Sequence, residues 1–61
     1  MNDNAYKNMA VVLANWALDF GKSKQDAHNY MDRILVLDEL TRDKMVRTIN
    51  ESIDKVRSNN E

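Results

Sequence analysis

The single histidine of the chain, His28, is the first residue with a side chain suited to metal binding or catalysis. Asp32 follows it four residues later, so both side chains would lie on one face of a helix and could share a metal ion. Two ligands make a weak site, because structural zinc takes four, and the sequence has no cysteine to add. We therefore interpret the pair as a surface histidine beside a carboxylate, and we expect no metal and no other cofactor.

Nucleophilic catalysis would need a nucleophile, an imidazole base and a carboxylate held together on a rigid scaffold. The serines are Ser23, Ser52 and Ser58, and His28 is the one imidazole available to them. The single glycine of the chain cannot form the glycine-rich loop that wraps a phosphate. We expect that the protein is not an enzyme.

Three basic residues close together, Arg42, Lys44 and Arg47, suggest nucleic-acid binding instead. If segments 24–36 and 42–57 form a helix-turn-helix, these side chains lie at the start of its recognition helix. This interpretation is kept as the alternative function.

The surroundings of the same turn argue against nucleic acid. Asp38, Glu39 and Asp43 would repel phosphates about as strongly as the bases attract them. The connection from Val36 to Thr41 also lacks the glycine that such turns often contain. Nucleic acid is therefore the less favoured partner.

The overall charge does not favour binding to nucleic acid or to an anionic membrane, because nine basic and ten acidic residues leave a formal net charge of −1. Residues Met1–Asn4 do not include a basic segment followed by an apolar one, as a secretion signal would. The longest apolar run, Met9–Ala14, is too short to span a bilayer. We expect a cytoplasmic protein that does not act at a membrane.

The composition predicts helix through nearly the whole chain, because its 61 residues include one glycine and no proline. Gly21 follows the first apolar segment and is typical of the left-handed residue that ends a helix. Ser23 and Asp26 have the spacing of a capping box that starts the next one. These signals and the apolar periodicity predict helices over residues 3–20, 24–36 and 42–57.

The start of the third helix has two candidate caps in the sequence. Thr41 stands between two apolar residues at the positions of a hydrophobic staple, and Asp38 competes with it. We place the start after Thr41, and we expect residues 58–61 to fray.

These elements predict an all-α protein, a compact three-helix bundle that forms a single domain over residues 1–61. In the first helix we assign the buried side to one broad stripe of apolar residues, namely Ala5, Tyr6, Met9, Val12, Leu13, Trp16, Ala17 and Phe20. The expected core consists of Leu13, Trp16, Phe20, Tyr30, Met31, Ile34, Leu35, Ile49 and Ile53.

A second apolar stripe falls on the opposite side of the first helix. Val11, Ala14 and Leu18 have the i, i+3, i+7 spacing of a helix-packing seam, with Lys7 and Asn15 beside it. A helix that is apolar on two sides needs a partner for both. We expect these five residues to form a protein interface.

The size of the chain also favours a partner. Chains below roughly 70 to 80 residues usually gain stability from disulfides, a metal or self-association, and the first two are not available here. We expect a small protein-binding regulator or adaptor that acts through its first helix and forms a homodimer.

Overall fold

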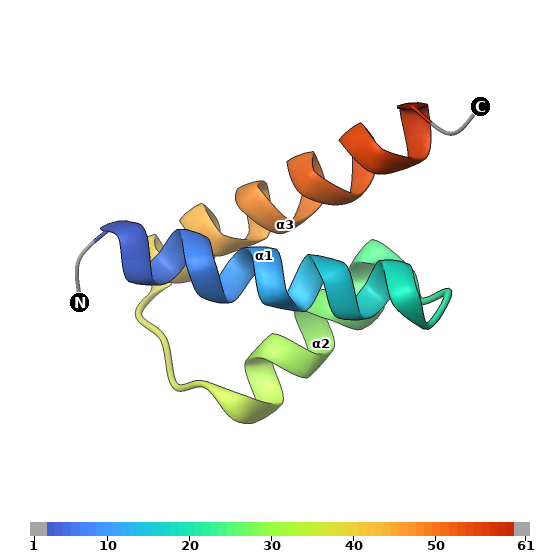
Figure 1. Ribbon diagram of the computed structural model, residues 1–61. Coiled ribbons are helices and arrows are strands. Elements are labelled where there is room, and N and C mark those ends of the chain that lie inside the picture. The colour runs from blue at the N-terminus through green and yellow to red at the C-terminus, as the bar shows by residue number, and fades with distance from the viewer. Residues whose placement is uncertain (1–2, 60–61) are drawn as a thin grey trace.

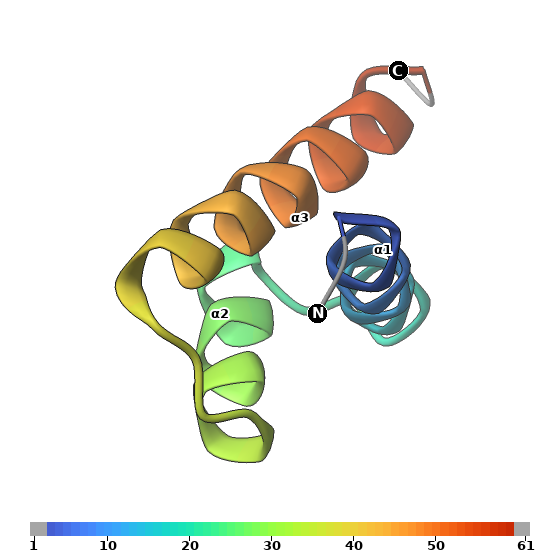
Figure 2. The ribbon, with the colours of Figure 1, turned by 90° about the vertical axis from the view of Figure 1, so that its left-hand side faces the viewer.

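A computed structural model describes residues 3–59 of the chain, with side chains from residue 5 onward. Three helices form this part of the protein: α1 (Asp3–Asp19), α2 (Lys24–Ile34) and α3 (Glu39–Asn59). Figures 1 and 2 show α1 and α3 running in the same general direction and crossing obliquely, with α2 running back from the end of α1 toward the start of α3. The predicted all-α three-helix bundle is confirmed.

The turn between α1 and α2 follows the predicted capping pattern. Gly21 has a φ of 65°, and the backbone N–H of Lys22 donates to the carbonyl of Ala17 over 2.8 Å, which closes α1 in a Schellman motif. The Ser23 hydroxyl accepts from the N–H of Asp26, and the Asp26 carboxylate accepts from the N–H of Ser23, each over 3.0 Å. Both ends of this turn are therefore set by local sequence.

The third helix starts earlier than predicted, because Asp38 and not Thr41 is its cap. The carboxylate of Asp38 accepts from the N–H of Thr41 over 3.4 Å, and its carbonyl accepts from the N–H of Arg42 over 2.9 Å. A carboxylate is favoured at this position because the helix dipole adds to the hydrogen bond. Thr41 is buried inside α3 instead.

The other helix ends differ from the prediction by smaller amounts. Helix α2 ends at Ile34, two residues early, and Leu35 takes an extended conformation as its cap. At the C-terminus α3 continues through Ser58 and Asn59, which we expected to fray. Residues 60–61 lie outside the described part of the chain.

The core contains fewer large side chains than predicted. Leu13, Met31, Ile49 and Ile53 are buried as expected, whereas Trp16 and Leu35 are only partly buried. The prediction is wrong for three others, Phe20, Tyr30 and Ile34, which are exposed. The fully buried apolar residues are Ala10, Leu13, Ala14, Ala17, Ala27, Met31, Met45, Ile49 and Ile53.

The buried face of α1 explains this difference. Its members Ala10, Leu13, Ala14 and Ala17 are mostly small, and α3 is the helix that α1 contacts most. Small residues at a helix contact allow the two axes to approach closely. The helix is therefore rotated by about a quarter turn from the predicted orientation, and its larger side chains lie at the edge of the core.

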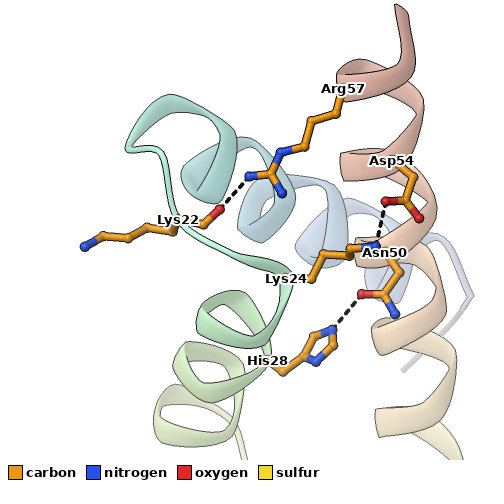
Figure 3. Close-up of polar contacts among 6 residues, drawn as sticks. All are labelled: Lys22, Lys24, His28, Asn50, Asp54 and Arg57. Carbon is orange, nitrogen blue, oxygen red and sulfur yellow. Dashed lines mark hydrogen bonds and ion pairs between the residues drawn. The ribbon is translucent and has the colours of Figure 1, made fainter. Parts of the chain in front are cut away.

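Polar contacts attach α2 to α3 (Figure 3). Lys24 forms an ion pair with Asp54 over 2.7 Å, and His28 Nε2 lies 2.8 Å from Asn50 Oδ1. The guanidinium of Arg57 donates to the carbonyl of Lys22 over 2.6 Å. Because α2 contributes only Ala27 and Met31 to the buried core, these contacts add to the apolar packing that attaches it to α3.

Candidate functional site

The residues predicted as a protein interface do not form one exposed seam. Ala14 is fully buried in the core, and Leu18 is half-buried against it. Val11 is 41% exposed, and Lys7 and Asn15 are exposed. The expectation that Ala14 lies on a free surface is wrong, because α1 turns this residue toward α3.

A different apolar surface is exposed on α1 and α2. We call it the aromatic face, and it consists of Met9, Val12, Trp16, Phe20, Tyr30 and Ile34. Phe20 is 68% exposed, Val12 60% and Ile34 50%. The four α1 members have the i, i+3, i+7, i+11 spacing that places side chains along one line of a helix.

Ring contacts connect the two helices within this face. The rings of Trp16 and Tyr30 meet edge to face with centroids 4.7 Å apart, and those of Trp16 and Phe20 are tilted at 6.5 Å. Such pairs contribute about 0.5 to 1.5 kcal/mol beyond the area they bury. Trp16 therefore fixes the positions of two more exposed rings.

At the other end of the aromatic face, Met9 borders a small apolar cavity of about 100 Å³. Leu35 and Leu37, from the connection between α2 and α3, and Met45, from α3, form other walls of it. The aromatic face thus runs from a cluster of rings at one end to a hollow that fits one aliphatic side chain.

Charges of both signs border the aromatic face. A cleft of about 460 Å³ beside Trp16 and Tyr30 is lined by Lys22, Arg33 and Asp26. The hydrogen bond from the backbone of Ser23 holds the pKa of Asp26 below its usual value, so this carboxylate is negative at neutral pH. These three charges leave a balance of about +1 on the border, with both signs present.

The residues proposed for nucleic-acid contact separate into two groups. Arg42 forms a two-pronged ion pair with Asp32, with Nε and a terminal nitrogen each 2.9 Å from a carboxylate oxygen. The hydrogen bond from Arg42 lowers the pKa of Asp32. Lys44 and Arg47, by contrast, line a cleft of about 290 Å³ between α1 and α3 together with Lys7.

His28 lies next to Asn50 and not beside a set of metal ligands. Among the described residues, no three side chains of the histidine, cysteine, aspartate and glutamate types come together as a group that could hold a metal ion. No helix within residues 3–59 combines the length and the apolar character needed to cross a membrane.

Comparison with protein-family models, curated proteins and solved structures found no match to this chain.

Apolar periodicity did not predict the aromatic face, because it placed Val12, Trp16 and Phe20 in the core. One signal in the sequence does point to it. The first helix contains an alanine series, Ala10, Ala14 and Ala17, that can pack closely against a neighbour while the large residues face elsewhere.

Proposed function

We propose that the protein is a small binding module that acts by covering a surface of another polypeptide with its aromatic face. The observation that supports this most directly is that several large apolar side chains of α1 and α2 are exposed together in the aromatic face of a chain of only 61 residues. Single exposed aliphatic residues are ordinary on any protein, whereas a contiguous apolar patch is typical of an interface. Aromatic residues and methionine are also enriched at such interfaces.

The partner that this face fits best is a second copy of the chain. Lys22 and Arg33 on its border can pair with Asp26 of another copy across a two-fold axis, because an isologous contact needs only one self-complementary surface. A strongly acidic or basic partner would meet repulsion from one of the two signs. The net charge of −1 adds little repulsion between copies.

Self-association would also stabilise the chain, because its own core is small. Among the described residues, the buried apolar side chains larger than alanine are those of Leu13, Met31, Met45, Ile49 and Ile53, which make a small core for an independent domain. Pairing two aromatic faces would remove Phe20, Val12 and Ile34 from water in both copies at once. The proposed regulator or adaptor would then act as a homodimer.

Sedimentation equilibrium over a range of concentrations tests this proposal. The wild-type chain should change from monomer to dimer as its concentration rises. Val12→Asp should keep it monomeric, because the new charge would be buried without a partner. Val11→Asp is the matched control, since it adds the same charge one residue away and outside the aromatic face.

The two variants also separate the aromatic face from the seam predicted by sequence. If Val11→Asp abolishes association and Val12→Asp does not, the interface is the Val11 and Leu18 side of α1. A wild-type chain that stays monomeric at every concentration would contradict the homodimer. Circular dichroism of each variant shows whether the helices are intact.

The other predicted functions have less support. The ion pair with Asp32 occupies Arg42, which the helix-turn-helix interpretation needs for DNA contact. The absence of enzymatic activity and the cytoplasmic location stay predictions.

A further inference from the structure

A second cleft, between α1 and α3, differs from the aromatic face in the residues that line it. Its volume is about 290 Å³, and its walls are formed by six residues with charged or hydroxyl side chains: Tyr6, Lys7, Lys44, Arg47, Thr48 and Glu51. On α1, the buried face lies between Lys7 on one side and the residues of the aromatic face on the other. The cleft therefore offers a site that is separate from the proposed protein interface.

The charges that converge on this cleft are mainly positive. Lys7 and Arg47 supply two positive charges and Glu51 supplies one negative charge, and Lys44, which already has an interaction partner within the protein, adds a third positive charge near them. Among the side chains of residues 5–59, ion pairs join Lys24 to Asp54 and Arg42 to Asp32. Neither Lys7 nor Arg47 takes part in an ion pair with a described side chain, so their charges are available to an anion.

The hydroxyl groups of the cleft can each bond to a ligand. The phenolic oxygen of Tyr6 lies 3.5 Å from the buried Thr41 hydroxyl, a long contact, so the Tyr6 hydroxyl can donate to a ligand. The Thr48 hydroxyl donates to the carbonyl of Lys44 over 3.0 Å, so its oxygen is an acceptor. One part of the cleft is thus rich in donors, and Thr48 and Glu51 provide acceptors.

We propose that this cleft binds a phosphate monoester. A monoester carries nearly two negative charges at neutral pH and three acceptor oxygens, which match the positive charges of Lys7 and Arg47 and the donor groups of Lys7, Arg47 and Tyr6. A volume near the lower limit of small-molecule pockets, roughly 300 Å³, leaves room for the phosphate and a small organic group. Glu51 and Thr48 would accept hydrogen bonds from the organic part.

Titration of the ¹⁵N-labelled protein with phenyl phosphate, followed by amide chemical shifts, tests this site. Phenyl sulfate at the same ionic strength is the control ligand, because it has nearly the same shape and a single charge. Phenyl phosphate should saturate shifts at residues 6–7 and 44–51, and phenyl sulfate should bind several times more weakly. Lowering the pH from 7.5 to 5.5 should weaken phenyl phosphate binding about fourfold, since the second phosphate pKa is about 6.

Variants of the cleft assign the contacts. Arg47→Gln should weaken phenyl phosphate binding about tenfold, and Lys7→Gln should do so by a similar factor. Glu51→Gln should strengthen binding about twofold, because it removes a like charge. Lys55→Gln is the matched control, since it removes one exposed charge of α3 outside the cleft.

The outcomes decide between a defined site and general charge attraction. Shifts that do not saturate, equal binding of phenyl sulfate, or equal losses in Arg47→Gln and Lys55→Gln would each overturn the proposal. A phosphotyrosine peptide compared with phenyl phosphate identifies the source of the monoester. Equal affinities indicate a small molecule, and tighter binding of the peptide indicates a phosphorylated polypeptide.

Discussion

Trp16 and Tyr30 meet edge to face with their ring centroids 4.7 Å apart, and this contact joins α1 to α2 at the surface of the protein. The pair is part of the aromatic face and also helps to position α2, which places few apolar residues in the core. Stability and the proposed binding surface therefore share a residue.

Replacing Trp16 with alanine should lower the free energy of unfolding by about 2 kcal/mol. The loss is below the 3 to 5 kcal/mol typical of a fully buried tryptophan, because Trp16 is only partly buried. Urea denaturation at low protein concentration measures it. Phe20→Ala, at an exposed ring, should change the same quantity by less than about 1 kcal/mol. Equal losses would show that Phe20 is buried in solution.

Replacing Ile53 with alanine should destabilise the chain more, by about 2 to 5 kcal/mol, because its side chain is fully buried. Such a loss approaches the whole stability of a small domain, so partial unfolding at room temperature is expected. Val56→Ala, one turn later at an exposed position of α3, should lower the unfolding free energy by less than about 1 kcal/mol. Thermal denaturation followed by circular dichroism compares the two, and a larger effect at Val56 would contradict the assigned face of α3.

Gly21→Ala should destabilise the chain by about 1 kcal/mol, because the φ of 65° at this position is unfavourable for an L-residue. No atom lies within 4 Å of the position of the added Cβ, so crowding does not contribute. Chemical synthesis of the chain with D-alanine at position 21 supplies the control. The D-residue should be at least as stable as glycine in urea denaturation, and a D-residue that destabilises as much as L-alanine would refute the conformational explanation.

Asp26→Asn should reduce stability at neutral pH and have a smaller effect in acid. The hydrogen bond from the backbone of Ser23 lowers the pKa of Asp26 in the folded state, from its ordinary value of 3.8. The ionised carboxylate therefore stabilises the fold above about pH 3.8, and this contribution is lost as the pH falls through the lower, folded-state pKa.

Urea denaturation of both chains from neutral pH down to about pH 2 measures this effect. Asp32 and Asp38 also have lowered pKa values, so both chains lose stability in acid, and the difference between them isolates Asp26. A difference that is the same at every pH would show that ionisation of Asp26 does not contribute.

The sequence was sufficient where structure depends on a few neighbouring residues. Gly21, Ser23 and Asp26 specify the first turn through backbone conformation and reciprocal hydrogen bonds, and this turn was predicted correctly. The start of α3 was predicted wrongly because Asp38 and Thr41 are both acceptable caps by local rules. In the folded protein Thr41 is buried, with its hydroxyl 3.5 Å from that of Tyr6, a residue distant in sequence, and local rules do not include such a contact.

The orientation of α1 could not be read from apolar periodicity alone. Apolar residues occur around most of this helix, so several faces satisfy the pattern. The structure buries Ala10, Ala14 and Ala17, because small residues let α3 come close, and it leaves Phe20 and Val12 exposed. The prediction that α1 has more apolar residues than its buried face requires was therefore correct, but the exposed apolar residues are not the ones that were predicted.

The contacts shown in Figure 3 give the two ends of α2 different sensitivities to dissolved salt. The first half of this helix is attached to α3 partly through exposed polar contacts such as the Lys24–Asp54 ion pair, whereas Tyr30 is held by its ring contact with Trp16 and Met31 by burial. Dissolved ions screen exposed ion pairs and have little effect on contacts between buried apolar groups. Increasing ionic strength should thus loosen the start of α2 while Tyr30 keeps its place beside Trp16, so the ring cluster presented to a partner is the same in dilute and in concentrated salt.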